Sequence, residues 1–332
     1  MGPCTSVQHK RAAALPLATP AIVSDLATLV RVSRLYYELG ETQEEIAALV
    51  GVTRSQVSRL LKEARAQGIV EIRIVDRAEV QSPAADALRD RFGLRAVHLA
   101  PSLDDPGEVT RRRVGRLAGQ VLRGAIRDGM VVGIGDGAAV SAVADELAST
   151  GSTVDATVVP LCGGFWRPGS GAEPFRRVGD ALGATVHALH APGVLDDARV
   201  RDALCAHPGV RSVFDLWSRL DVALFGIGGP AWSEASVGRQ AMAEISVGGA
   251  VGEILIAPFA IDGRLVAESL RARTVAFDAR ALASVSLTIG VAEGRGKLAP
   301  ILGALRGGFL NVLVTDARTA EGVLNLADEA AA

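Results

Sequence analysis

A run of polar and basic side chains between residues 53 and 66 has the composition needed to contact a nucleic acid. Hydroxyl, amide and guanidinium groups hydrogen-bond to base edges in a major groove, and arginine and lysine also neutralise phosphates. Four side chains are candidates for base contact: Ser55, Gln56, Ser58 and Arg59. Three further cations are candidates for phosphate or guanine contact: Arg54, Lys62 and Arg65. The pattern therefore predicts a short helix that docks on double-stranded DNA.

The neighbouring residues predict the two helices that would position these side chains. Thr42 and Glu45 have the spacing of a capping box, Thr53 and Gln56 repeat it, and Gly51 supplies a tight turn between them. The second helix also has an apolar face opposite its basic one: Val57, Leu60, Leu61 and Ala64. This is the pattern of a helix-turn-helix. We include Thr42 among the candidates for DNA contact.

The charge of this region is divided between the two helices. The whole chain has a formal net charge of −2, and residues 38–45 contain four acids and no base. The second helix instead carries four cations against Glu63 alone, so phosphate neutralisation would fall on that helix. The alternative is a helical hairpin whose charged face is only solvated. The agreement of caps, turn, apolar face and charge favours DNA binding.

The flanking residues complete a winged arrangement. Residues 24–39 have apolar side chains at helical spacing, with Ser24 as a candidate cap. After Gly68, residues 69–75 alternate between apolar and polar side chains, which predicts a short strand. The sequence therefore predicts a winged helix-turn-helix.

Length and composition indicate a globular chain of two domains. Its 332 residues exceed one average domain, 49% are hydrophobic, and the 37 glycines favour α/β architecture. Three distant cysteines fit a reducing cytoplasm, and no apolar run is long enough to span a membrane. Prolines interrupt the apolar stretch near the N-terminus, which argues against a signal peptide. We divide the chain into a disordered tail at 1–22, a DNA-binding domain at 23–76, a linker at 77–84 and a larger domain at 85–332.

Short apolar runs in the larger domain predict strands, and helix-like segments lie between most of them. The runs are 96–99, 130–134, 155–161, 185–189, 221–227, 286–291 and 310–314. The helices are 107–128, 138–148, 173–183, 198–206, 296–306 and 317–328. This alternation predicts a largely parallel sheet covered on both faces. Asp262-Gly263 between two further strand-like runs predicts an antiparallel hairpin.

Glycine-rich segments follow several predicted strands and indicate a ligand pocket. They are 133–137, 162–164 and 226–229. Open parallel sheets bind ligands beyond the carboxyl ends of their strands, where glycine lets the backbone approach the ligand. None of the segments is a complete dinucleotide or Walker motif, so each is a weak signal alone. Glu253 could accept hydrogen bonds from sugar hydroxyls, and Lys297 could hold a phosphate or polarise a carbonyl. By residue type alone, both are more typical of an exposed surface.

Several longer blocks carry a resemblance to a known family. They are RLYYELGETQEEIAALVGVTRSQVSRLLKEARAQGIVEI, VGIGDG, VVPLCGG, GIGG, GAVGEI and GVAEGRGKLAPILGALRGGFLNVLVTD. In this order, from residue 28 to about 325, the chain resembles the SorC/DeoR-type sugar-binding transcriptional regulators of bacteria. The resemblance implies a winged helix-turn-helix joined to a Rossmann-like α/β effector domain similar to sugar-phosphate isomerases and deaminases. In the family this domain has lost catalysis and senses a phosphorylated sugar or a polyol.

The resemblance also implies an effector site, carried over by position. Its residues would be Gly135, Asp136, Gly137, Ala138, Cys162, Gly163, Glu253 and Lys297. This sequence departs from the family in the first loop, where many relatives have Thr, Ser or Arg after the glycine. Here Ala138, Ala139 and Val140 follow, and Asp136 adds a negative charge. This departure favours an unphosphorylated sugar or polyol.

We therefore expect a ligand-controlled transcription factor that binds operator DNA in the cytoplasm. A homodimer or homotetramer would place paired helices in successive major grooves, and the larger domain would bind the effector and form the oligomer. The effector would bind one arrangement of the oligomer better than another. We expect no cofactor, no metal and no membrane partner. The arginines at 111–113 could lie at a subunit interface, and we expect them to face water.

The main alternative is an enzyme, a sugar-phosphate isomerase or deaminase with Glu253 as the base and Lys297 as the phosphate clamp. It leaves the helix-turn-helix unexplained. A nucleophilic Cys162 is weaker still, because no histidine can be assigned beside it. His187 and His190 lie in a predicted strand, where residues three apart point to opposite faces, so they do not predict a metal site.

Overall fold

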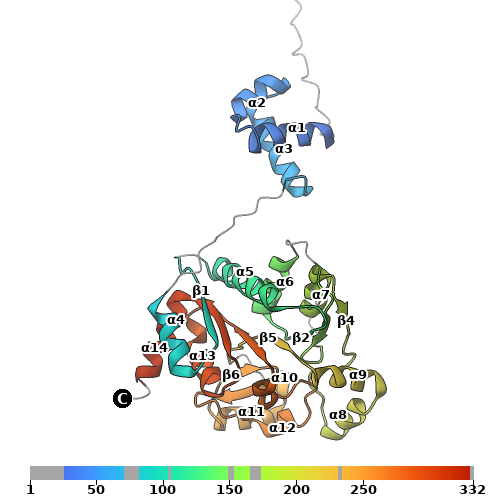
Figure 1. Ribbon diagram of the computed structural model, residues 1–332, viewed down its shortest axis with the longest axis vertical. Helices are drawn as coiled ribbons and strands as arrows, with labels where there is room; N and C mark the ends of the chain where they lie inside the picture. Colours follow the sequence, from blue (N-terminus) through green and yellow to red (C-terminus); the bar gives the residue numbers. More distant parts are fainter. Residues whose placement is uncertain are drawn as a thin grey trace, which may run out of the picture. The chain divides into compact units, whose positions relative to one another are not determined.

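The computed structural model contains two compact units, residues Met1–Asp76 and Arg77–Ala332 (Figure 1). The structure describes residues 26–70, 82–103, 106–148, 153–164, 173–230 and 234–329. The expected tail, the expected cap at Ser24, most of the expected wing strand and most of the expected linker lie outside these residues. Each unit has a hydrophobic core of its own.

Three helices make up the described part of the smaller unit. They are α1 (Leu26–Tyr37), α2 (Gln43–Val50) and α3 (Arg54–Ala66). All three contribute to one buried apolar cluster: Leu29, Val32, Ile46, Ala47, Val57, Leu60, Leu61 and Ala64. Gly51 ends α2 in the left-handed conformation (φ 74°), which glycine adopts without the steric cost of a side chain. The turn brings α3 into contact with both preceding helices, and the predicted helix-turn-helix is confirmed.

Seven parallel strands form the sheet of the larger unit, in the order β1-β9-β8-β5-β2-β3-β4. They are β1 (Ala96–Ala100), β2 (Val131–Ile134), β3 (Thr157–Pro160), β4 (Thr185–Val186), β5 (Val222–Gly226), β8 (Leu287–Val291) and β9 (Val312–Asp316). Every predicted apolar run overlaps one of these strands, and their parallel pairing follows from the helical crossovers between them. β4 is shorter than predicted, so His187 and His190 lie beyond it and not in a strand.

Helices cover both faces of this sheet, which makes a three-layer α/β unit (Figure 1). One face carries α5 (Gly107–Ala125), α6 (Ala138–Leu147) and α7 (Pro174–Leu182). The other carries α4 (Pro83–Phe92), α9 (Pro208–Trp217), α13 (Leu298–Arg306) and α14 (Ala317–Glu329). Strand β5 shows why two cores form. Val222 and Leu224 belong to the core under α5, α6 and α7, whereas Ala223 and Phe225 belong to the core under α4, α9, α13 and α14. The residues alternate in this way because successive strand residues point to opposite faces.

A hairpin and several short helices complete the larger unit. They are β6 (Ala250–Ile254), β7 (Ala257–Ala260), α8 (Ala198–Cys205), α10 (Glu234–Val237), α11 (Arg239–Val247), α12 (Glu268–Arg271), η1 (Ala279–Ser284) and η2 (Arg295–Lys297). β6 and β7 pair antiparallel through a turn in which Leu255 and Ile256 have φ values of 48° and 65°. The predicted hairpin at Asp262-Gly263 is present as a second reversal, because an antiparallel bridge joins Phe259 and Leu265 on either side of it. In this turn the Gly263 N–H donates to the Ala260 carbonyl at 2.9 Å.

Helix α4 begins inside the segment predicted as a linker. The Ser82 side chain accepts a hydrogen bond from Ala84 N at 3.2 Å, and Pro83 is the first helical residue. A proline fits there because the N–H that it lacks has no partner in the first turn of a helix. Leu88 anchors the helix by complete burial. The prediction treated Pro83 as a mark of irregular structure, whereas it starts a helix.

Candidate functional site

The capping boxes that begin α2 and α3 are both present, as predicted. Thr42 Oγ1 accepts from Glu45 N at 3.3 Å, and Thr42 N donates to Glu45 Oε2 at 2.8 Å. Thr53 and Gln56 make the same pair of hydrogen bonds at 3.3 and 2.8 Å. The Thr42 hydroxyl and the Gln56 amide oxygen are thus engaged within the smaller unit. For Gln56 the amide nitrogen remains as a donor to a base or phosphate.

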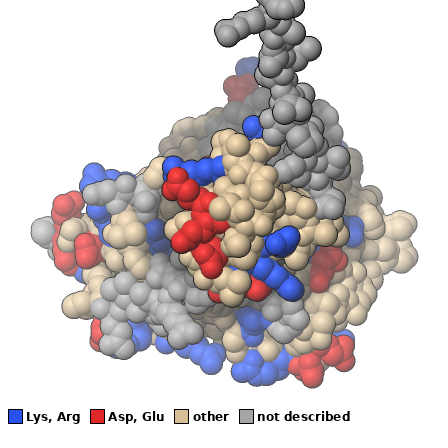
Figure 2. Space-filling model, turned by 90° about the horizontal axis from the view of Figure 1, so that it is seen from above, with Lys and Arg blue, Asp and Glu red and all other residues tan. Residues whose placement is uncertain are grey.

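The polar side of α3 is exposed, while its apolar side is buried. Six of the predicted DNA-contacting residues are exposed: Arg54, Ser55, Ser58, Arg59, Lys62 and Arg65. Arg54, Arg59 and Lys62 make no ion pair or side-chain hydrogen bond with other described residues. In the surface view of Figure 2, acidic side chains form a contiguous group, and basic side chains border it. Cations without an internal partner lose no contact when they bind phosphates.

The connections that follow two adjacent strands of the larger unit lead to opposite sides of the sheet. β2 and β5 are neighbours, but the chain passes from β2 to β3 on one side and from β5 to β8 on the other. Open α/β sheets bind ligands at such a position, beyond the carboxyl ends of the strands. The predicted glycine-rich segments at 133–137 and 226–229 contain the ends of these two strands. They lie side by side, because an added Cβ at Gly226 would be 3.7 Å from the Asp136 carbonyl oxygen.

Glu253 lies directly beside the exit of β5. Gly228 N donates to the Glu253 carbonyl at 2.9 Å, and Glu253 N donates to the Gly228 carbonyl at 3.2 Å. The half-buried Glu253 side chain lies over Gly228, where an added Cβ would approach Glu253 Cγ to 2.5 Å. The β6–β7 hairpin therefore brings this acid to the edge where strands β2, β3 and β5 end.

Lys297 reaches the same place from η2, which follows β8. Its Nζ donates to the Ile227 carbonyl at 2.9 Å and would lie 3.6 Å from a Cβ at Gly229. Burial lowers the pKa of Lys297, and the carboxylates of Glu293 and Glu253 act in the opposite direction. Lys297 on η2 and Glu253 on β6 thus interact although they come from different elements. The structure brings these two predicted residues together.

Cys162 lies at the exit of β3 and is buried. Burial raises the pKa of its thiol to about 12, and the carboxylates of Asp136 and Glu253 add to the shift. The thiol is therefore protonated at neutral pH, which counts against the reading of Cys162 as a nucleophile. Gly163 packs against backbone instead, since an added Cβ would approach the Ala191 carbonyl oxygen to 2.6 Å. Its N–H donates to the Val275 carbonyl at 2.8 Å.

The loop after β2 supplies the remaining predicted residues. Gly137 has a φ of 121° and precedes Ala138, the first residue of α6. The Asp136 Oδ1 atom accepts from Gly137 N at 2.7 Å. Asp136 is half-buried, whereas Ala138 is exposed. The carboxylates of Asp136 and Glu253 both raise the pKa of the Cys162 thiol.

Two charged residues near Lys297 were not among the predicted site residues. Glu293 follows β8 and is 10% exposed, and its Oε1 atom lies 2.7 Å from Nε of Arg111 on α5. The side chain of Arg111, which was expected to face water, is 41% exposed and also makes this ion pair. The position of Glu293 directly after a buried strand was a usable signal. The pairing with Arg111 was not, because 182 residues separate the two.

Asp316, at the end of β9, was also missed. Its carboxylate accepts from Ser102 Oγ at 2.8 Å, Gly294 N at 3.1 Å and Thr319 Oγ1 at 2.5 Å. Burial raises the pKa of Asp316, but these hydrogen bonds outweigh burial and hold the pKa below its ordinary value. Asp316 thus ties the segment that begins at Gly294, and carries Lys297, to the ends of β1 and β9.

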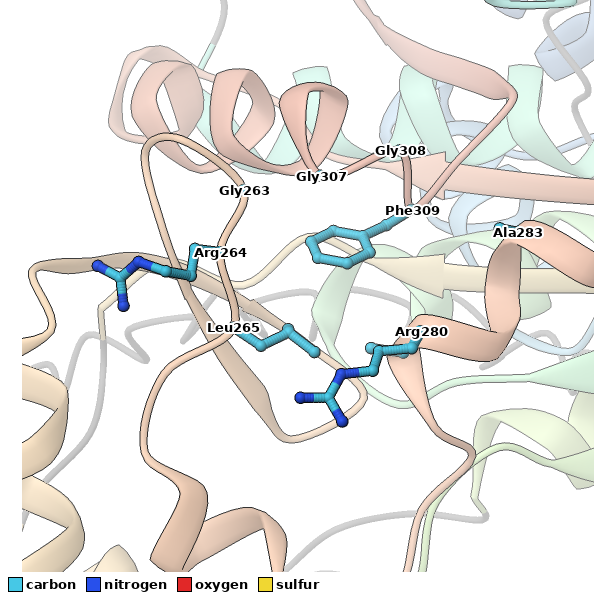
Figure 3. A pocket seen from close by; sticks show the side chains of 9 residues that line it. Gly263, Arg264, Leu265, Arg280, Ala283, Gly307, Gly308 and Phe309 are labelled. Atoms are coloured by element: carbon cyan, nitrogen blue, oxygen red, sulfur yellow. The ribbon is translucent and has the colours of Figure 1, made fainter.

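A cavity of about 410 Å³ lies at the opposite edge of the sheet (Figure 3). It is lined by the turns that carry Gly263 and Phe309 and by η1, and the latter two precede strands β9 and β8. In Figure 3 the Leu265 and Phe309 side chains point into the space, whereas Arg264 points away. This cavity is separate from the predicted effector residues.

Among the residues that the structure describes, no group of three or more His, Cys, Asp or Glu side chains is arranged to hold a metal ion. No helix in this part of the chain has the length and apolar character needed to cross a bilayer.

Two family models match the chain. The model described as "Putative sugar-binding domain" matches residues 76–325. The model of a Crp-like helix-turn-helix domain matches residues 24–91. The first match contains all the predicted effector residues, from Gly135 to Lys297. The second match contains the two capped helices and the exposed face of α3.

Relatives match the chain over nearly its whole length. It is 30% identical to the sorbitol operon regulator of Klebsiella pneumoniae, over 90% of this chain and 98% of that protein. It is 31% identical to the transcriptional regulator LsrR of Klebsiella pneumoniae subsp. pneumoniae, over 96% of this chain and 98% of that protein. The crystal structure of the full-length sorbitol operon regulator SorC from Klebsiella pneumoniae gives a TM-score of 0.70 at 29% identity, covering 90% of this chain and 99% of that chain.

Proposed function

We propose how this chain, which belongs to the SorC/DeoR-type family of sugar-binding bacterial transcriptional regulators, divides its function between its two units. The smaller unit binds operator DNA through α3. The larger unit binds a carbohydrate effector beyond the carboxyl ends of its strands and thereby changes operator affinity. The observation that carries the proposal is an exposed basic helix face, on which Arg54, Arg59 and Lys62 have no partner among the described residues, present in one chain with a carbohydrate-type site.

On the DNA side, α3 enters the major groove of a duplex. Arg59, Ser58 and Ser55 lie near base edges, and Gln56 joins them through its amide nitrogen. Arg54, Lys62 and Arg65 contact phosphates or guanines, and Thr42 lies at the start of the supporting helix. The exposure of the α3 cations and the capping boxes that fix the helix start support this assignment. Base contacts give sequence specificity, and phosphate contacts give affinity that depends on salt.

The chain acts as a homodimer or homotetramer in the cytoplasm, without a membrane partner. A near-palindromic operator then receives two α3 helices in successive grooves, which is how symmetric helix-turn-helix proteins read DNA. The effector changes DNA affinity only by the difference between its affinities for two arrangements of the oligomer.

On the effector side, the ligand occupies the edge where strands β2, β3, β5 and β8 end. Glu253 accepts hydrogen bonds from ligand hydroxyls, and Lys297 donates to a ligand oxygen. Gly135, Asp136, Gly137 and Ala138 form one wall, and Cys162 and Gly163 form the floor. The convergence of these residues from separate strands supports the assignment.

The role is regulatory, and no cofactor takes part. An isomerase or deaminase would use Glu253 as its base, and nothing in that reading accounts for α3. Incubation of the full chain with sugar phosphates separates the two functions. Turnover would support the enzyme, whereas binding without turnover supports the regulator.

The direct test uses DNA duplexes that the full chain selects from a random library. Their affinity for the chain is measured with and without a panel of pentoses, hexoses, polyols and their phosphates. We expect at least one panel member to change the affinity. The variant Glu253→Ala should bind the duplex normally and lose that response. Failure of the wild type to enrich any duplex sequence would refute the DNA-binding half of the proposal.

A further inference from the structure

The backbone N–H groups at the exit of β2 already have partners within the protein. Gly135 N donates to the Leu224 carbonyl at 2.8 Å, and Gly137 N donates to Asp136 Oδ1 at 2.7 Å. Between them, the Asp136 backbone makes a hydrogen bond to Cys162 that favours the thiolate. Loops that bind phosphate work by presenting consecutive N–H groups to the ligand. Here three consecutive residues direct these groups at protein atoms.

The Asp136 carboxylate also supplies the negative charge that the start of α6 favours. A helix N-terminus stabilises a nearby anion, through its dipole and its free N–H groups. In this chain the anion is the side chain that precedes the N-cap Gly137. The next two residues, Ala138 and Ala139, offer no side-chain donor that could hold a second anion.

Two cations at this edge, Arg111 and Lys297, also have partners within the protein. Arg111 is paired with Glu293 at 2.7 Å, and Lys297 donates to the Ile227 carbonyl and interacts with the carboxylates of Glu293 and Glu253. Asp136 adds a further carboxylate to Glu293 and Glu253. A phosphate dianion at the exit of β2 would add negative charge beside the carboxylates of Asp136 and Glu253.

Resting on the proposed function, we infer that the effector is an uncharged polyhydroxyl compound, a free sugar or a polyol, and that Asp136 excludes its phosphate esters. Asp136 and Glu253 accept hydrogen bonds from ligand hydroxyls, and Lys297 donates to a third oxygen. Carboxylates accept strong hydrogen bonds from neutral hydroxyls, whereas they repel a phosphate. Asp136 is thus a specificity-determining residue that contacts the ligand.

The first test uses inorganic phosphate as a probe, because it does not require the effector to be known. Thermal unfolding of the full chain is measured against phosphate concentration at constant ionic strength, for the wild type, Asp136→Ser and the control Asp215→Asn on the exposed side of α9. We expect a saturable rise in Tm for Asp136→Ser only. A saturable rise of equal size in the wild type would overturn the inference.

The second test compares each uncharged sugar or polyol with its own phosphate ester, by the concentration that changes the affinity of the full chain for its selected duplex. The wild type should respond to the uncharged member at a concentration at least tenfold lower. Asp136→Asn keeps an oxygen that can accept from Gly137 N, and thermal unfolding of the full chain confirms that the larger unit folds. It should reduce the preference at least tenfold.

A wild type that prefers the phosphate ester, or an Asp136→Asn variant with an unchanged preference, would overturn the inference and leave the proposed function intact. Failure of the proposed function itself would give a different result. The full chain would select no duplex, or no uncharged compound and no phosphate ester would change its DNA affinity, and the inference would then fail as well.

Discussion

Gly228 and Glu253 exchange two backbone hydrogen bonds, of 2.9 and 3.2 Å, at the point where β6 passes the exit of β5. The glycine is required by space, because a Cβ at residue 228 would lie 2.5 Å from Glu253 Cγ and 2.9 Å from its Oε1. The position of the carboxylate is therefore set by the absence of a side chain on the neighbouring strand.

The substitution Gly228→Ala should displace the Glu253 side chain and abolish or strongly weaken the effector response. Overpacking of this kind costs about 1–3 kcal/mol of stability, which leaves the chain folded. DNA affinity without effector should stay within twofold of the wild type. Measurement of duplex binding against effector concentration checks both expectations. Gly124→Ala on α5, where an added Cβ meets no atom within 4 Å, is the matched control. A full response in Gly228→Ala would show that Glu253 does not bind the effector.

Arg59→Ala should weaken binding to the selected duplex by about 1–3 kcal/mol, because a bidentate contact to a base is lost. Lys62→Ala should weaken binding to selected and unrelated duplexes by similar factors and reduce the salt dependence. Both are measured by duplex titration at fixed and varied salt. Arg239→Ala in the larger unit removes an arginine whose side chain is 90% exposed and should change neither value. Equal affinity of Arg59→Ala and wild type for the selected duplex would remove Arg59 from the base-contacting set.

The sequence predicted the elements whose formation depends on residues close together in the chain. The two capping boxes need only residues three apart, and both are present. The parallel strands were predicted because each is a short apolar run that must be buried on both faces. The β6–β7 turn was not predicted, because Leu255 and Ile256 adopt positive φ values that their side chains disfavour. Tertiary contacts impose that conformation, since both side chains are buried.

The site could be predicted only as separate segments. Glycine-rich strand exits indicated where a ligand would bind, and resemblance pointed to Glu253 and Lys297. The contacts that organise the site join residues distant in sequence, such as Arg111 with Glu293 and Ser102 with Asp316. A pattern in one sequence does not contain such pairs, because they depend on the order of strands in the sheet.

Asp316→Asn should weaken effector binding and lower the free energy of unfolding by about 1–3 kcal/mol. Its amide NH₂ would face one of the N–H or O–H donors that now point at the carboxylate, which leaves a buried donor without an acceptor. The segment from Gly294 to Lys297 then loses an anchor. Chemical denaturation and effector titration measure the two effects. Asp328→Asn, a change at a side chain that is 70% exposed on α14, should alter both by less than about 0.5 kcal/mol. An equal effect of the two variants would contradict the anchoring role of Asp316.

The buried thiol of Cys162 should make the chain less stable in alkali. The pKa of Cys162 is raised in the folded protein from 9.0 to about 12, chiefly by burial. An unfolded chain therefore releases the proton at lower pH, and the favourable difference is lost as pH rises from 9.0 toward 12. Below pH 9 the group has no effect on the slope. The free energy of unfolding should therefore fall more steeply over this range in the wild type than in Cys162→Ser, as measured by chemical denaturation at stepwise pH. Cys205→Ser is the control, because Cys205 is only half-buried and its replacement should change the slope less. If the free energy of unfolding changed with pH in the same way for the wild type and Cys162→Ser, the thiol would be accessible to water. It should then react with thiol reagents at neutral pH.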